Sequence, residues 1–148
     1  MNNDQIDTAK GTISTCICDL IQIAERADDR NLVNKLKAQK LLLDGLDERI
    51  ERSQLPDGFV RSVINDVRLD VLMIYGDLKF LFTLKKQEAA APTEKLKQQA
   101  HNRLAEYKGQ TLQPVEIAIF SSTERLPEIE QTLNKLKEIE HHLHESLL

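Results

Sequence analysis

The sequence has 148 residues, of which 41% are hydrophobic and 30% are charged, and its net charge is −4. A chain of this length can bury a core as one domain, and its apolar content is too high for an intrinsically disordered protein. The opening MNNDQIDTAK lacks the basic and apolar regions of a secretory signal, and no apolar run reaches the roughly 20 residues of a membrane span. We therefore expect a cytoplasmic protein without membrane contact.

Apolar residues recur every three or four positions through most of the chain, a spacing typical of amphipathic helices. This spacing predicts a first helix over residues 4–27 and a second over residues 31–52. The segment Ala27–Asn31 interrupts the pattern and offers aspartate and asparagine side chains as helix caps. The predicted core stripes are Ile6, Ala9, Ile13, Cys16, Leu20, Ile23 and Ala27 in the first helix, and Leu32, Leu36, Leu43, Leu46 and Ile50 in the second.

A Pro-Asp-Gly turn within residues 53–59 precedes a third predicted helix, residues 57–86. A helix that is apolar on most of its circumference must be covered on most sides, by the rest of the bundle or by another subunit. The first apolar stripe consists of Val60, Ile64, Val67, Val71, Ile74, Leu78 and Leu81, and the second of Leu69, Met73, Phe80 and Leu84. On this basis we predict partner binding at Val71, Ile74, Tyr75, Phe80 and Phe82.

The second half of the chain contains shorter elements. Residues 87–93 form a predicted linker, and residues 93–108 a weakly amphipathic helix. Residues 113–123 are compatible with a strand or with a short helix opened by a proline; we expect a helix, because a lone strand would have no partner. The last helix begins at Pro127 and is expected to pack Ile129, Leu133, Leu136, Leu143 and Leu147 inward.

These elements describe an all-α protein, an antiparallel helical bundle of four or more helices. We expect about five or six helices when the short ones are included. We expect a single domain over residues 1–148, with a weak internal linker near residues 87–93.

Three of the four histidines lie near the end of the sequence, beside glutamates. At about 100° of rotation per residue, only His141 and His144 are neighbours, with Glu140 or Glu145 as a possible third ligand. A structural zinc site needs four ligands and usually includes cysteine. We therefore expect no metal and no cofactor, and interpret these histidines as the hydrated end of the last helix.

Three further residues are candidate reactive groups. His101 is expected at the boundary of its helix. Cys16 belongs to the core stripe, whereas Cys18 faces the polar side. On a helix the two cysteines lie about 200° apart, so they can neither pair with each other nor share a metal. Free cysteines fit a reducing compartment, and the reactivity of Cys18 stays open.

No phosphate-binding loop, nucleophile elbow or paired-carboxylate motif is present, so the sequence favours a protein that is not an enzyme. Residues 85–108 carry six basic and three acidic side chains, and Tyr107 is the only aromatic residue among them. Nucleic-acid binding usually rests on aligned phosphate contacts and stacking aromatics, so we interpret this segment as a solvated helix face.

Two functions remain. The first is a non-catalytic protein-interaction module, an adaptor, regulator or export-type chaperone, which binds partners on helical surfaces and self-associates as a homodimer. The alternative is a metal-binding or catalytic bundle in which His101, His141 and His144 converge. We favour the interaction module.

Overall fold

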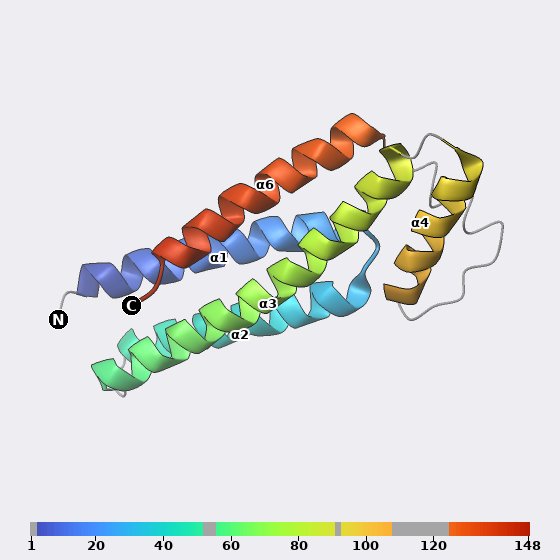
Figure 1. The fold of residues 1–148 in the computed structure, drawn as a ribbon. Helices are drawn as coiled ribbons and strands as arrows, with labels where there is room; N and C mark the ends of the chain where they lie inside the picture. The colour runs from blue at the N-terminus through green and yellow to red at the C-terminus, as the bar shows by residue number, and fades with distance from the viewer. Residues whose placement is uncertain (1–2, 52–55, 91–92, 108–124) are drawn as a thin grey trace. The chain divides into compact units, whose positions relative to one another are not determined.

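The computed structural model describes residues 3–51, 56–90, 93–107 and 125–148, and for residues 3–4, 47–51 and 107 it describes the backbone alone (Figure 1). All regular structure in these residues is helical, which confirms the all-α prediction. The predicted segment 113–123 lies outside the described residues. The helices are α1 (Asn3–Arg26), α2 (Arg30–Glu51), α3 (Asp57–Ala90), α4 (Glu94–Tyr107) and α6 (Leu126–Glu145).

The chain forms two compact units. The first contains residues 1–76 and 137–148, and the second contains residues 77–136, so that the division falls within α3 and within α6. The single domain expected over residues 1–148 stays a prediction. α3 continues as a helix to Ala90, which shortens the expected linker at 87–93 from its N-terminal side. No helix in the described parts of the chain is long and apolar enough to cross a membrane.

A tight turn joins α1 to α2 in the first unit. The backbone N–H groups of Asp28 and Asp29 donate to the carbonyls of Glu25 and Ala24, each at 3.0 Å, a Schellman arrangement that ends α1. Asp28 takes the left-handed conformation that this motif requires, with φ 54°. The Oδ1 atom of Asp29 accepts from the N–H of Leu32 at 3.2 Å and caps α2. The predicted capping by an aspartate of this segment is confirmed, whereas Asn31 lies within α2.

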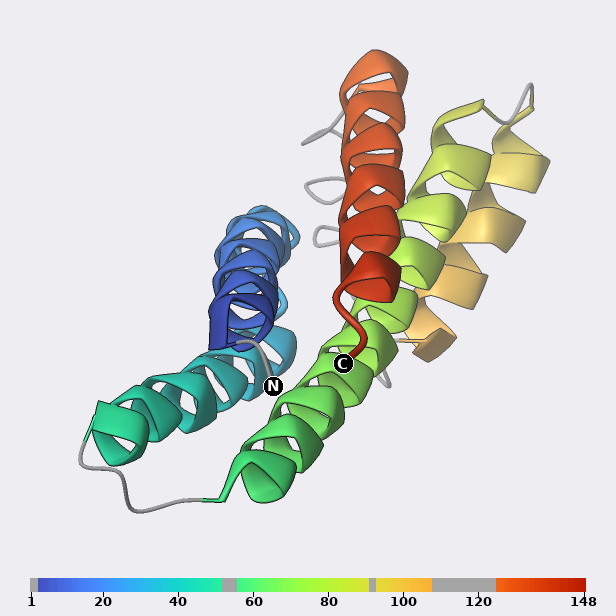
Figure 2. The same cartoon turned by 90° about the vertical axis from the view of Figure 1, so that its left-hand side faces the viewer.

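Within the first unit, the end of α6 runs antiparallel to the start of α3 (Figures 1 and 2). Tyr75 of α3 contacts Glu140 of α6, and the earlier Asn65 contacts the later Leu148. Since the residue numbers fall along α3 as they rise along α6, the two segments have opposite directions. This antiparallel pairing agrees with the predicted bundle.

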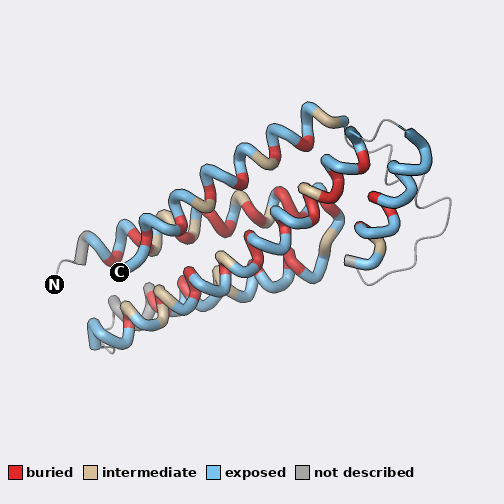
Figure 3. The backbone as a smooth tube through the Cα atoms, in the orientation of Figure 1, coloured by how far each residue is buried: buried red, intermediate tan, exposed pale blue. Residues whose placement is uncertain are grey.

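The predicted stripes form most of the core (Figure 3). All residues of the predicted α1 stripe are buried, and so are all residues of the first predicted stripe of α3, from Val60 to Leu81. The four residues of the α2 stripe whose side chains are described are buried as well. Leu147 was predicted to pack inward and is 61% exposed, so this prediction was wrong. The physical reason is that α6 ends at Glu145 and the chain leaves the helical path before Leu147.

The second unit contains buried polar side chains. His101 of α4 was expected at a helix boundary, but its side chain is only 2% exposed. Its Nδ1 atom lies 3.0 Å from Oε1 of Glu88 on α3, and this carboxylate partner is what allows an imidazole to be buried there. Lys86 and Glu130 form an exposed ion pair at 3.9 Å between α3 and α6.

Candidate functional site

The five residues predicted to bind a partner differ in accessibility. Val71, Ile74, Tyr75 and Phe82 are buried within the chain, whereas Phe80 is 51% exposed. Four of these side chains therefore contribute to the core of the described protein. Partner binding at these positions stays a prediction, and among the five Phe80 offers the accessible surface.

A row of exposed apolar side chains follows one face of α3, and we call it the α3 stripe: Leu69, Met73 and Phe80. The spacing of four and seven residues places the three on one side of the helix. Leu84, predicted to continue this row, is buried instead. An exposed apolar row with helical spacing is typical of a surface that binds another helix.

Three exposed aspartates run beside the α3 stripe: Asp66, Asp70 and Asp77. Each precedes a stripe residue by three positions, so the acidic row and the apolar row are parallel along the helix. Asp70 also accepts a hydrogen bond from Gln39 of α2 at 3.2 Å. A partner on the stripe therefore meets negative charge along one edge.

The three clustered histidines do not converge. Nε2 of His141 lies 3.0 Å from a carboxylate oxygen of Glu145, and Nε2 of His144 lies 3.7 Å from one of Glu140. These are separate pairs on the exposed side of α6, four residues apart in each case. No group of three or more potential metal ligands occurs in the part of the chain that the structure describes.

The other proposed ligands and thiols lie elsewhere. His101 belongs to the second unit and pairs with Glu88, whereas His141 and His144 belong to the first. Cys16 is buried and Cys18 is exposed, as predicted, and neither forms a disulfide. The reactivity of Cys18 stays an open question.

Polar side chains of α3 contact the last two turns of α6. The Tyr75 hydroxyl donates to Oε2 of Glu140 at 2.7 Å, and Nη1 of Arg68 donates to the carbonyl of Leu143 at 3.3 Å. Burial, followed by the hydrogen bond from Tyr75 and the negative charge of Glu140, raises the pKa of Tyr75 above its ordinary value. Arg68 is buried and supplies a cation where the α6 dipole is negative.

Asn65, one turn earlier on α3, contacts the chain beyond α6. Its Nδ2 donates to the main-chain oxygen of Leu148, and its Oδ1 accepts from the main-chain N–H of the same residue, both at 3.1 Å. We call Asn65, Arg68 and Tyr75 the clamp row, because each holds a group of α6 or of the segment that follows it. The three residues lie on one side of α3.

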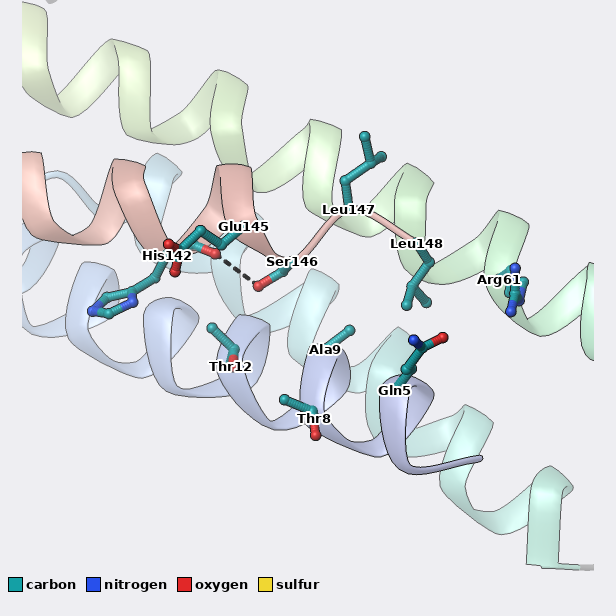
Figure 4. Close-up of a pocket in the computed structure, with 10 residues that line it drawn as sticks. All are labelled: Gln5, Thr8, Ala9, Thr12, Arg61, His142, Glu145, Ser146, Leu147 and Leu148. Atoms are coloured by element: carbon teal, nitrogen blue, oxygen red, sulfur yellow. Dashed lines mark hydrogen bonds between the residues drawn. The ribbon is translucent and has the colours of Figure 1, made fainter. Parts of the chain in front are cut away.

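A cavity of about 510 Å³ lies beside this segment, between α1, α3 and the end of α6 (Figure 4). The side chain of Leu148 points toward Gln5 of α1, whereas that of Leu147 points to the other side of the segment. The lining residues are Gln5, Thr8, Ala9, Thr12, Arg61, His142, Glu145, Ser146, Leu147 and Leu148.

Sequence analysis missed the clamp row and this cavity. A partial signal for the clamp row is present in the sequence, because Asn65 and Arg68 are polar residues three positions apart, beside the first apolar stripe of α3. Their targets are backbone atoms, which no side-chain pattern identifies. Comparison with known protein families, with curated proteins and with solved structures finds no match to this chain.

Proposed function

We propose that this protein is a non-catalytic protein-interaction module that self-associates through the α3 stripe. The observation that carries the proposal is the exposure of Leu69, Met73 and Phe80 at helical spacing on one helix. Burying such a row against an apolar surface contributes about 25 cal/mol for each Å² of apolar area removed from water. A second copy offers the same row, and a two-fold contact between identical helices is a common way to cover it.

The acidic row distinguishes a second copy from a basic partner. A second copy brings its own Asp66, Asp70 and Asp77 to the interface and also carries a net charge of −4. Added salt screens the repulsion between the copies and is expected to strengthen self-association. Binding of a lysine-rich or arginine-rich helix would weaken with salt.

Light scattering on a size-exclusion column tests the proposal. The full chain is expected at twice its mass of 16.9 kDa. Met73→Glu is expected to give the monomer, because it places a charge in the apolar row. Leu41→Glu on α2 is a matched control, since Leu41 and Met73 are each 71% exposed, and it is expected to leave the dimer intact.

Two outcomes would contradict the proposal. A monomeric full chain at every protein concentration and salt concentration contradicts self-association. Dissociation by both variants would show that added negative charge, rather than the α3 stripe, controls the mass.

A further inference from the structure

The chain following α6 lies in a groove of the first unit. We name residues Leu147 and Leu148 the tail, and we name the cavity beside it, with Asn65, the tail groove. We propose that the tail groove is a binding site for an extended peptide segment of another protein, and that the tail is an intramolecular occupant which such a peptide displaces. This inference concerns a surface different from the α3 stripe and does not rest on self-association.

Asn65 recognises backbone rather than side chain. Its amide donates to the main-chain oxygen and accepts from the main-chain N–H of a single residue, Leu148, at 3.1 Å in each direction. Every residue except proline carries this donor and acceptor, so the same two hydrogen bonds are available to an incoming extended peptide. Main-chain hydrogen bonds of this kind provide affinity in many peptide-binding sites, while pockets for side chains provide specificity.

The tail occupies the groove loosely. Leu147 is 61% exposed, and Leu148 is only partly buried. A cavity of about 510 Å³ stays open beside them (Figure 4). A peptide that fills more of this cavity than the tail does would bury more surface, and this difference favours exchange.

The walls of the tail groove define the chemistry of the peptide. Gln5, Thr8 and Thr12 on one side of α1 line the groove with amide and hydroxyl groups, and Arg61 of α3 also lies in its wall. The fitting ligand is thus a short extended segment with an aliphatic residue at the position of Leu148 and polar neighbours.

The tail can leave without unwinding α6. The Ser146 hydroxyl donates to the carbonyl of His142 at 2.7 Å, and Arg68 donates to that of Leu143. These contacts cap the end of the helix before the chain reaches Leu147. Displacement therefore breaks the two hydrogen bonds of Asn65 and exposes the partly buried Leu148.

A labelled peptide, His-Glu-Ser-Leu-Leu, with the sequence of residues 144–148 is the probe, and fluorescence anisotropy is the measurement. A chain ending at Ser146 is expected to bind this peptide about tenfold more tightly than the full chain, because the competing tail is gone. Asn65→Leu in the shortened chain is expected to weaken binding by about tenfold. Asn34→Leu, at an exposed asparagine of α2, is the control and should change nothing.

Equal affinity of the full and shortened chains overturns the proposal, as does unchanged binding by Asn65→Leu. Circular dichroism checks that the shortened chain keeps its helix content. If it does not, the full chain is titrated with unlabelled peptide: saturation must shift the ¹H–¹⁵N resonances of the Asn65 side chain, and unchanged resonances refute displacement. A mass that is dimeric for the full chain and monomeric for the chain ending at Ser146 assigns the groove to the tail of a second copy and also overturns the proposal.

Discussion

In the first unit, two sides of α3 reverse the usual distribution of residues in a globular protein, because polar side chains face a neighbouring helix and apolar side chains face solvent. The side that meets α6 carries Asn65, Arg68 and Tyr75, whereas Leu69 and Met73 are exposed to solvent. Each polar side chain bonds a particular atom of α6 or of the tail, which offsets part of the cost of removing it from water. Such contacts fix how the chain folds, whereas exposed apolar surface is available to a partner.

The second unit continues this contrast. Glu88 is buried with His101, while Phe80 on the same helix is exposed. If the buried polar residues fix the fold and the exposed apolar residues bind a partner, substitutions of the buried polar residues must lower the free energy of unfolding. Substitutions of the exposed apolar residues must not.

The largest effect is expected from His101→Leu. This change leaves the Glu88 carboxylate buried without its imidazole partner at 3.0 Å and should lower the free energy of unfolding by about 3 kcal/mol. Urea unfolding followed by circular dichroism measures it. His142→Leu, at an exposed position of α6, is the matched control and is expected within about 0.5 kcal/mol of the parent chain. Equal effects of the two changes would remove the distinction between the buried and the hydrated histidines.

Adjacent substitutions on α3 compare its two sides directly. Arg68→Ala removes a buried donor to the carbonyl of Leu143 and is expected to cost about 2 kcal/mol. Leu69→Ala removes a half-exposed side chain and should cost no more than about 0.5 kcal/mol in the monomer. Guanidinium chloride titrations at low protein concentration give both values. A larger loss from Leu69→Ala would show that the α3 stripe belongs to the core.

Tyr75→Phe is expected to have a smaller effect, about 1 kcal/mol at neutral pH, because it removes one hydrogen bond to the partly exposed Glu140. Its pH dependence is more informative. The pKa of Tyr75 is raised in the folded chain, so its contribution to stability is complete below the ordinary value of about 10 and declines as the pH rises above it. Denaturant titrations at successive pH values should therefore show a flatter dependence above pH 10 for Tyr75→Phe. If the free energy of unfolding changed with pH in the same way for the parent chain and for Tyr75→Phe, the raised pKa of Tyr75 would be contradicted.

Periodicity alone predicted the helices and most of the core. The stripe of α1 is buried throughout because a spacing of three and four residues leaves one side of a helix to face its neighbours. Periodicity failed at two positions, one decided by a polar contact and the other by the end of a helix. His101 is buried because of a carboxylate thirteen residues away, and Leu147 is exposed because α6 ends at Glu145.

The candidate sites were less predictable than the fold. The second apolar stripe was visible in the sequence, but the number of sides that the bundle covers depends on packing between helices. That is why Leu84 is buried and Met73 is exposed. The tail groove depends on two hydrogen bonds between the Asn65 side chain and backbone atoms of Leu148, 83 residues away, and residue types do not encode such a contact.

Urea unfolding at two protein concentrations a hundredfold apart tests most directly whether the α3 stripe joins two copies. If folding and self-association are linked, the dimer gains about 2.7 kcal/mol of apparent stability over this range, and the midpoint shifts to higher urea. Met73→Glu should abolish the shift, and Leu41→Glu should preserve it. A midpoint that is the same at both concentrations for the full chain would contradict self-association through the α3 stripe.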